Sequence, residues 1–250
     1  MFKINNYKKP DICIPLTGKN LNEIKDQLAL IIPKQPKLLE LRADYLEEIA
    51  DKKSVLEIVN YISKQTNIPL LFTIRSSREG GEDIPLDELE ILKLLKIICR
   101  QTNVKMIDYE VANNKENVTE IIACAQNEGK EVILSYHNFT ETPASEDLID
   151  KLYLMEELGA NHAKIAVMPN NQADVFRLLD ISYHLSKQLS IPLTILSMGE
   201  LGKLSRVIGW MYGSRITFAI GVESSAPGQI AIRDLQHSID STYKIIKKES

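Results

Sequence analysis

Cysteine is scarce in this chain of 250 residues, and no two cysteines stand close together. The three that occur, Cys13, Cys99 and Cys124, are set among apolar neighbours and form no C-x-x-C pair. An odd number of scattered cysteines makes neither a disulfide framework nor a cysteine-ligated zinc site. We therefore expect three small buried thiols in a protein of a reducing compartment.

Long apolar runs and a secretion signal are also missing. The most apolar segment, residues 89–99, is interrupted by Lys93 and Lys96, so no segment has the length of a membrane span. The first ten residues lack the apolar core of a signal peptide. A net charge of −4 provides no overall attraction to nucleic acid or to an anionic membrane. We expect a cytoplasmic protein that binds neither nucleic acid nor membrane.

Motifs for metal and nucleotide binding are absent as well. There is no H-E-x-x-H, and Asp108 with Glu110 is a weak carboxylate pair for a metal. No Gly-Lys-[Ser/Thr] accompanies Gly80-Gly81, which excludes a P-loop, and no G-x-G-x-x-G follows the first apolar run. We expect no metal, and the missing motifs argue against a bound nucleotide or dinucleotide.

What the chain does contain is a regular alternation of short apolar runs and amphipathic stretches. The spacing predicts eight strands, each followed by a helix, at intervals of roughly 25–35 residues without a linker. The predicted strands lie within residues 12–16, 37–42, 69–75, 104–110, 131–137, 161–169, 192–196 and 216–220. This alternation predicts an α/β protein with a parallel sheet, and eight units favour a single-domain (β/α)8 TIM barrel over residues 1–250. An open doubly wound sheet is the alternative.

Local signals predict several helix ends. Asp51 is expected to cap the second helix, Gly129 to close the fourth, and Thr142 with Pro143 to begin the fifth. The seventh helix is expected over residues 201–211 and the last from about residue 229 to 247.

One lysine, Lys164, stands inside the apolar stretch 161–169. Side chains alternate along a strand, so Lys164 and Ala166 share one face and Ile165 and Val167 the other. Taken alone, the stretch favours an edge-strand lysine that keeps its ammonium group in water. The alternative is a desolvated amine that attacks a carbonyl substrate.

Ionisable residues stand at the C-terminal end of five predicted strands, which is where barrels of this kind hold their active sites. They are Glu40 and Arg42, Arg75, Asp108 and Glu110, His137, and Lys164. Each alone has a structural explanation as a buried ion pair or a packed histidine, but five at one end indicate an active site. The other histidines, His162, His184 and His237, are assigned to structure.

Three arginines offer fixed positive charge near this end of the barrel. Arg42, Arg75 and Arg206, together with desolvation, are expected to lower the pKa of Lys164 from about 10.4 towards neutrality. The loop over residues 221–229 has small residues and is either a lid over the barrel mouth or an ordinary connection.

Six short segments stand in an order found in a known family. They are residues 40–44 (ELRAD), 72–82 (FTIRSSREGGE), 135–139 (SYHNF), 163–169 (AKIAVMP), 204–206 (LSR) and 225–229 (SAPGQ). Together they resemble the type I 3-dehydroquinate dehydratases of the shikimate pathway, over nearly the whole chain. The resemblance implies a cofactor-free hydro-lyase, a homodimer, that converts 3-dehydroquinate to 3-dehydroshikimate.

The same resemblance implies roles for individual residues. Lys164 would form an imine with the ketone, and His137 would act first as general base and then as general acid. Glu79 would hold the imidazole in its working tautomer, and Arg206 would pair with the substrate carboxylate. Glu40, Arg42 and Arg75 would contact the ring hydroxyls, and Ser225 and Gln229 would bind the substrate by closing the lid over the bound acid.

The chain departs from this pattern at the end of the first strand. Pro15 stands there in place of a serine that some relatives carry, and proline supplies neither a hydroxyl nor a backbone N–H. We therefore expect no substrate contact from this strand. Two other functions stay open: a class I Schiff-base aldolase on the same barrel, and a non-catalytic barrel that binds a polyhydroxy acid.

Overall fold

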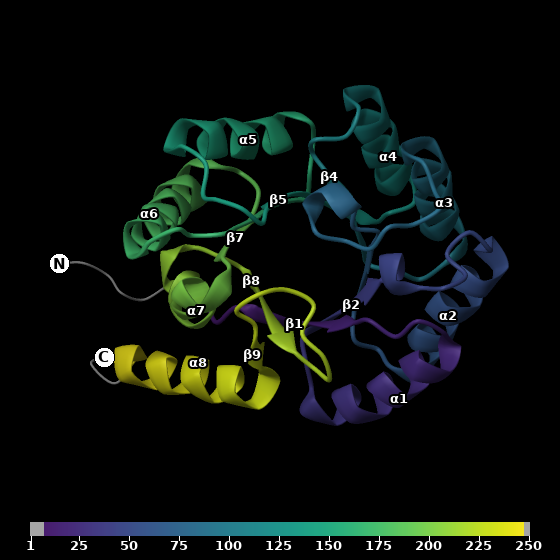
Figure 1. The fold of residues 1–250 in the computed structure, drawn as a ribbon, viewed down its shortest axis with the longest axis horizontal. Helices are drawn as coiled ribbons and strands as arrows, with labels where there is room; N and C mark the ends of the chain where they lie inside the picture. Colours follow the sequence, from purple (N-terminus) through teal and green to yellow (C-terminus); the bar gives the residue numbers. More distant parts are fainter. Residues whose placement is uncertain (1–7, 248–250) are drawn as a thin grey trace.

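Eight parallel strands form a ring, and the helices surround it (Figure 1). The strands are β1 (Asp11–Leu16), β2 (Leu38–Arg42), β3 (Leu70–Thr73), β4 (Met106–Glu110), β5 (Glu131–Asn138), β6 (His162–Val167), β7 (Leu193–Ser197) and β8 (Ile216–Ile220). The helices are α1 (Leu21–Ile31), α2 (Lys52–Gln65), α3 (Glu88–Gln101), α4 (Lys115–Asn127), α5 (Ser145–Glu157), α6 (Gln172–Gln188), α7 (Gly199–Ile208) and α8 (Ile232–Lys247). This computed structural model describes residues 8–247 and confirms the predicted (β/α)8 barrel. The ends of the predicted 1–250 domain lie outside the described residues.

The ring closes differently between β7 and β8 than elsewhere. Neighbouring strands from β8 through β1 to β7 pair in continuous parallel register, whereas β7 and β8 meet at a single bridge between Leu193 and Ser214. Side-chain hydroxyls replace ladder bonds there. The N–H of Ile216 donates to Oγ1 of Thr194 (3.1 Å), and the N–H of Ile195 donates to Oγ of Ser214 (3.1 Å). The seam is therefore held by two hydroxyl groups together with one backbone hydrogen bond, from the N–H of Arg215 to the carbonyl of Leu193 (2.9 Å).

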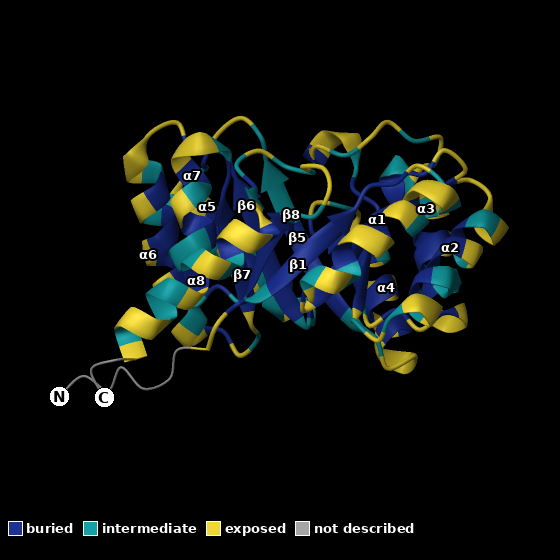
Figure 2. Cartoon of the chain, turned by 90° about the horizontal axis from the view of Figure 1, so that it is seen from below, coloured by how far each residue is buried: buried dark blue, intermediate teal, exposed yellow. Residues whose placement is uncertain are grey.

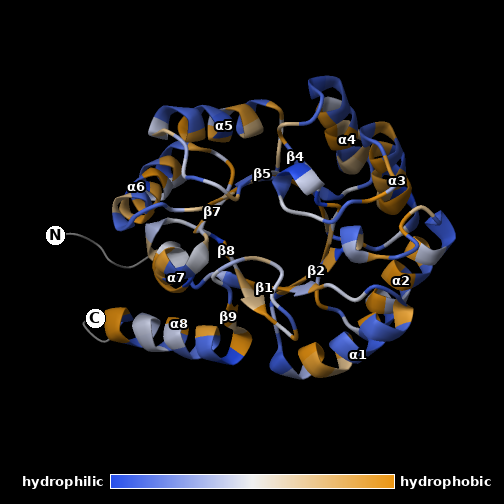
Figure 3. Ribbon diagram, in the orientation of Figure 1, coloured by the Kyte–Doolittle hydropathy of each residue, from blue (hydrophilic) through white to orange (hydrophobic). Residues whose placement is uncertain are grey.

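Two apolar layers result from the alternation of side chains along the strands. Ile165 and Val167 pack outwards with the helices, while Ala166 belongs to a smaller cluster inside the ring with Cys13 and Phe218. The strands are buried, and the exposed residues lie on the helices and the connecting loops (Figure 2). Each helix has hydrophilic and hydrophobic residues (Figure 3). The predicted division of β6 into two faces is confirmed, as is the burial of all three cysteines.

Several element ends differ from the sequence prediction. The start of α5 at Thr142 and Pro143 is wrong: the helix begins at Ser145, and Thr142 donates its hydroxyl proton to the carbonyl of Met168 (2.9 Å). The seventh helix begins at Gly199 and gives way after Ile208 to a short 3-10 turn. A two-residue strand, β9 (Ile230–Ala231), pairs with β8 just before α8 and was not predicted.

Other ends agree with the prediction. Asp51 caps α2 by accepting the N–H of Lys53 (3.0 Å), and Gly129 follows α4 with a φ of 65°. No helix within residues 8–247 combines the length and the apolar character that crossing a membrane requires.

Candidate active site

A cavity with about 480 Å³ of atom-free space opens at the C-terminal ends of the strands. All nine residues predicted for the site line it: Glu40, Arg42, Arg75, Glu79, His137, Lys164, Arg206, Ser225 and Gln229. They come from positions far apart in sequence, and the parallel strands bring them to one end of the barrel. Seven further residues complete the wall: Gly80, Phe139, Ala166, Leu196, Met198, Phe218 and Ala226.

Lys164 extends from β6 into the ring and is only 5% exposed. Its Nζ lies 3.1 Å from Oδ2 of Asp108 and 4.0 Å from Oε1 of Glu40. The edge-strand alternative is therefore wrong. The charged groups nearest the amine are carboxylates, and not the guanidinium groups that the sequence analysis expected beside it.

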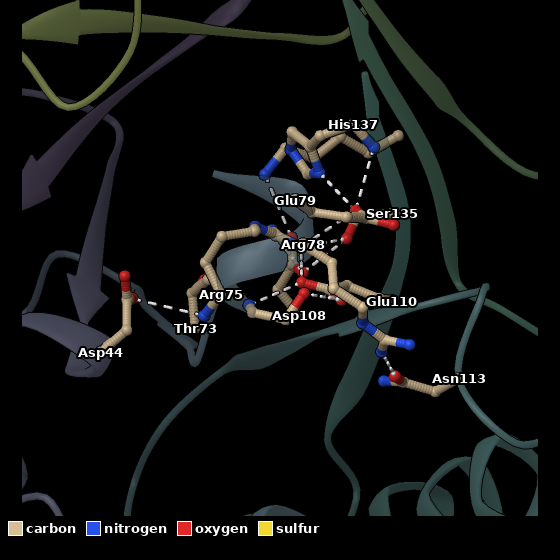
Figure 4. A network of polar contacts seen from close by, with 12 residues as sticks. Asp44, Thr73, Arg75, Arg78, Glu79, Asp108, Glu110, Asn113, Ser135 and His137 are labelled. Carbon is tan, nitrogen blue, oxygen red and sulfur yellow. Dashed lines mark hydrogen bonds and ion pairs between the residues drawn. The ribbon is translucent and has the colours of Figure 1, made fainter. Parts of the chain in front are cut away.

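Arg75 is the centre of a buried network that joins β3, β4 and β5 (Figure 4). Its guanidinium donates to Oδ1 of Asp108 (2.7 Å), to Oε1 of Glu110 (3.0 Å) and to Oγ of Ser135 (2.9 Å). Ser135 in turn donates to the same oxygen of Asp108 (2.6 Å). Burial would lower the pKa of Arg75, but the two carboxylates more than offset burial and raise it. The guanidinium is thus a permanent cation.

Asp108 links this network to the amine. Burial alone would raise the pKa of the Asp108 carboxyl, but Arg75 and Lys164 outweigh burial and lower it to about 2. The carboxylate is therefore ionised at any pH at which the protein works, with one oxygen towards Arg75 and the other towards Lys164.

Glu79 and His137 form a second unit at the mouth of the barrel. Glu79 ends a 3-10 turn (Ser77–Glu79), and its Oε2 lies 2.9 Å from both the backbone nitrogen and Nδ1 of His137. Burial, Arg75 and Lys164 lower the pKa of His137 well below its usual value, so the imidazole is neutral. Burial and the nearby Glu110 raise the pKa of Glu79 to about 8. When Glu79 is ionised, its carboxylate holds one nitrogen of the neutral imidazole and leaves the other nitrogen available as a base.

Asp44 holds the two arginines at the ends of β2 and β3 in place. Its carboxylate accepts two hydrogen bonds from Arg42, one from Nε (2.9 Å) and one from Nη2 (2.7 Å). It also accepts a hydrogen bond from the backbone N–H of Arg75 (3.3 Å). Glu40 lies on the same face of β2 as Arg42 and accepts a hydrogen bond from the hydroxyl of Thr73 (2.9 Å). The ELRAD segment therefore contributes a rigid, internally paired corner to the cavity.

Arg206, on α7, differs from the other arginines because it has no acidic partner within the described residues 8–247. Its Nη2 donates to the carbonyl of Pro227 (2.9 Å), and its buried Nε has no hydrogen-bond partner in the same range. Burial lowers the pKa of Arg206 to about 10, which still leaves it charged at neutral pH. A buried, unpaired guanidinium that lines a cavity is suited to a carboxylate or another planar anion.

The loop after β8 closes against α7. Gly228 has a φ of 76°, and a Cβ there would lie 2.3 Å from the carbonyl oxygen of Gly199. The close approach lets Gln229 turn inwards, where its Oε1 accepts the N–H of Ser225 (2.9 Å) and its Nε2 donates to Oγ of Ser225 (3.1 Å). Ser225 and Gln229 are thus oriented by each other.

The sequence analysis missed part of the site. Asp108 and Glu110 were noticed at a strand end but not assigned a role, and Asp44 stands in the ELRAD segment without one. The apolar lining residues Phe139 and Phe218 were not considered. Strand alternation would have placed Phe218 inside the ring, since it shares a face with Ile216. Among residues 8–247, no group of three potential metal ligands comes together.

Comparison with known proteins decides the family. The family model for type I 3-dehydroquinase matches residues 12–246. The chain belongs to the type I 3-dehydroquinase family. A 3-dehydroquinate dehydratase from Albidiferax ferrireducens is 44% identical over 229 residues, which are 91% of this chain and 87% of the relative. Members of this family are enzymes, specifically hydro-lyases.

Solved structures of the family agree with the fold. The 3-dehydroquinate dehydratase of Geobacillus kaustophilus superimposes with a TM-score of 0.92 at 38% identity, over 94% of this chain and 92% of that one. The type I enzyme of Clostridium difficile, solved with covalently modified comenic acid, gives a TM-score of 0.91 at 35% identity over 95% and 94% of the two chains. The chain therefore shares the barrel fold of these family members over nearly its whole length.

Proposed function

We propose that this family member dehydrates 3-dehydroquinate to 3-dehydroshikimate through an imine on Lys164. The observation that carries the proposal is that a buried amine, a neutral imidazole held by Glu79 and an unpaired arginine line one cavity. These are the groups that attack on a ketone, proton transfer and carboxylate binding each require.

The reaction proceeds in balanced steps. The unprotonated amine of Lys164 adds to the ketone, and uptake of one proton, which the final hydrolysis returns, with loss of one water gives a protonated imine. The imine withdraws electrons, so Nε2 of His137 removes the proton from the adjacent carbon. His137 then returns a proton to the departing hydroxyl group, which leaves as water. A second water hydrolyses the imine and frees Lys164, so one water is lost overall.

The remaining residues bind and orient the substrate. Arg206 pairs with the carboxylate, assisted by Ser225 and Gln229, and this gives the buried guanidinium the acidic partner that no side chain within residues 8–247 supplies. Glu40, Arg42 and Arg75 face the ring hydroxyls. Arg75 also keeps Asp108 charged beside Lys164.

The sequence supports further parts of the proposal. The resemblance implies a homodimer that needs no cofactor, while composition, motifs and spacing indicate a cytoplasmic protein without a metal and with one barrel domain, predicted over residues 1–250. Sedimentation equilibrium tests the dimer, and full activity after dialysis against a chelator tests the lack of a metal requirement.

Borohydride trapping tests the reaction itself. Treatment of the protein with 3-dehydroquinate and borohydride should leave a reduced adduct on the peptide that contains Lys164, read by mass spectrometry, while the untrapped reaction produces the absorbance of an enone. Lys164→Ala should give neither signal. Lys203→Ala, an exposed lysine paired with Glu200, is the matched control and should give both.

The outcomes separate the three functions. No adduct and no enone would support the non-catalytic binder. An adduct without an enone, with cleavage of a carbon–carbon bond, would support the aldolase. His137→Ala should still form the adduct but release no enone, and failure to trap any imine in that variant would contradict the assigned roles.

A further inference from the structure

Phe218, on β8, holds its aromatic ring over the amine of Lys164. The Nζ atom lies 4.6 Å from the ring centroid, and Phe218 is 5% exposed. A cation over the face of an aromatic ring is attracted by the ring quadrupole, and the attraction grows when water is excluded. None of the steps described above uses this contact.

We propose that Phe218 is a catalytic residue whose ring face stabilises the iminium cation formed on Lys164. The proposal rests on the proposed function, because it requires an imine. It adds a specific electrostatic task to a side chain that would otherwise be an apolar part of the cavity wall.

The change from ammonium to iminium makes the ring important. The ammonium group has three N–H bonds and reaches both Asp108 (3.1 Å) and Glu40 (4.0 Å). The iminium nitrogen is bonded to two carbons and keeps one N–H, so it can satisfy at most one of these carboxylates through a hydrogen bond. The ring interacts with the positive charge and not with a particular N–H. Its contact therefore persists when the hydrogen bonds are lost.

The surroundings of Phe218 strengthen the effect. Ala166, Leu196 and Met198 lie with Phe218 in the apolar cluster inside the barrel, and all three line the cavity. These side chains keep water from the side of the amine that faces Phe218, and electrostatic attraction is stronger in such a low-dielectric surrounding. An aromatic ring also accepts no proton, so it stabilises the cation without competing with His137.

Graded fluorination of the ring tests the proposal. Phe218 is replaced by phenylalanine with one, two or three ring fluorines, each of which weakens the quadrupole with little change in shape. The replacements are made in His137→Ala, where the imine is expected to accumulate, and the adduct trapped by borohydride is measured against the concentration of 3-dehydroquinate. Trifluorophenylalanine should lower the equilibrium constant for iminium formation from the unprotonated amine, which carries no charge for the ring to attract, by roughly ten- to thirty-fold, with intermediate values between. Phe218→Leu should lie at or below the trifluoro value.

Controls separate electrostatics from packing and from the parent proposal. Trifluorophenylalanine at Phe176, which is exposed on α6, should leave adduct formation unchanged. Equal adduct formation across the Phe218 series would overturn the role of the ring and leave the imine mechanism standing. Absence of any adduct in the unmodified protein would overturn both proposals.

Discussion

A single oxygen of Glu79 contacts His137 twice, at the backbone nitrogen and at Nδ1, both at 2.9 Å. When Glu79 is ionised, the Nδ1–H of the imidazole donates to it, and Nε2 keeps the lone pair that a general base requires. When Glu79 is protonated, its O–H donates to Nδ1 instead, and the ring hydrogen moves to Nε2. The charge of Glu79 therefore selects between a basic and a non-basic imidazole.

This relationship predicts the pH dependence of turnover. Because burial and Glu110 raise the pKa of Glu79 to about 8, kcat/KM should rise with pH and level off above about pH 8, and fall tenfold per unit at lower pH. Glu79→Gln should reduce kcat by about a hundred-fold. It should also abolish the rising limb of the pH profile, since the amide does not titrate. Steady-state rates between about pH 6 and 9 measure both. Persistence of the limb in the variant would assign it to another group.

Removal of the charge between Arg75 and Lys164 should destabilise the barrel. Asp108→Asn leaves two buried cations without their shared carboxylate, and loss of one partner of a buried pair costs about 3–5 kcal/mol. Urea unfolding at neutral pH measures the loss in free energy. Asp180→Asn is the matched control, because that aspartate has a side-chain exposure of 73% and should cost little. Similar stability of the two variants would show that the Asp108 pair contributes no more than a surface pair.

Arg206 is expected to lower the stability of the free protein while it binds the substrate. Arg206→Met removes a buried cation that has no acidic partner among residues 8–247, so the free energy of unfolding should increase by about 1 kcal/mol. The same variant should raise KM for 3-dehydroquinate at least about a hundred-fold. Arg206→Lys keeps the charge without the two-point fork and should give an intermediate KM. Decreased stability together with an unchanged KM would contradict both parts of this prediction.

The seam between β7 and β8 should make the barrel sensitive to acid through His162. Oγ1 of Thr194 accepts the N–H of Ile216 and lies 2.8 Å from Nε2 of His162, which ties the imidazole to the seam. Burial and Lys164 lower the pKa of His162 to about 3. The unfolded chain takes up this proton below about pH 6.5 and the folded chain does not, so stability falls as pH decreases from about 6.5 towards 3.

The size of this effect is measurable. One such group contributes a loss of about 1.4 kcal/mol per pH unit, and His137 adds a loss of the same sign. His162→Gln keeps a hydrogen-bond partner for Thr194. It should reduce the slope of the unfolding free energy against pH by the amount that one bound proton contributes, about 1.4 kcal/mol per pH unit. Urea titrations between about pH 4.5 and 7 give the slopes, and His184→Gln, an exposed histidine, is the control. Identical slopes in all three proteins would exclude His162 as the acid-sensitive group.

Local signals in the sequence predicted much of the fold. The alternation of faces in β6 follows from strand geometry alone, which is why Lys164 could be assigned to the side opposite Ile165. The helix beginning at Thr142 was predicted from the same kind of signal and is wrong, because Thr142 is used in a tertiary hydrogen bond to Met168. A local motif holds only where no distant partner competes for the same group.

The sequence by itself determined the eight-unit barrel, the face on which each strand residue lies, and the gathering of ionisable groups at one end of the ring. Only the tertiary structure decided their partners. Arg75 reaches Asp108, Glu110 and Ser135 across separations of 33, 35 and 60 residues, Phe218 lies over Lys164, and Arg206 alone among these arginines has no carboxylate within the described chain. The physical reason is that periodicity sets the direction of a side chain, whereas closure of the ring sets which distant groups come within a few ångströms, and charge and hydrogen bonding act only at that range.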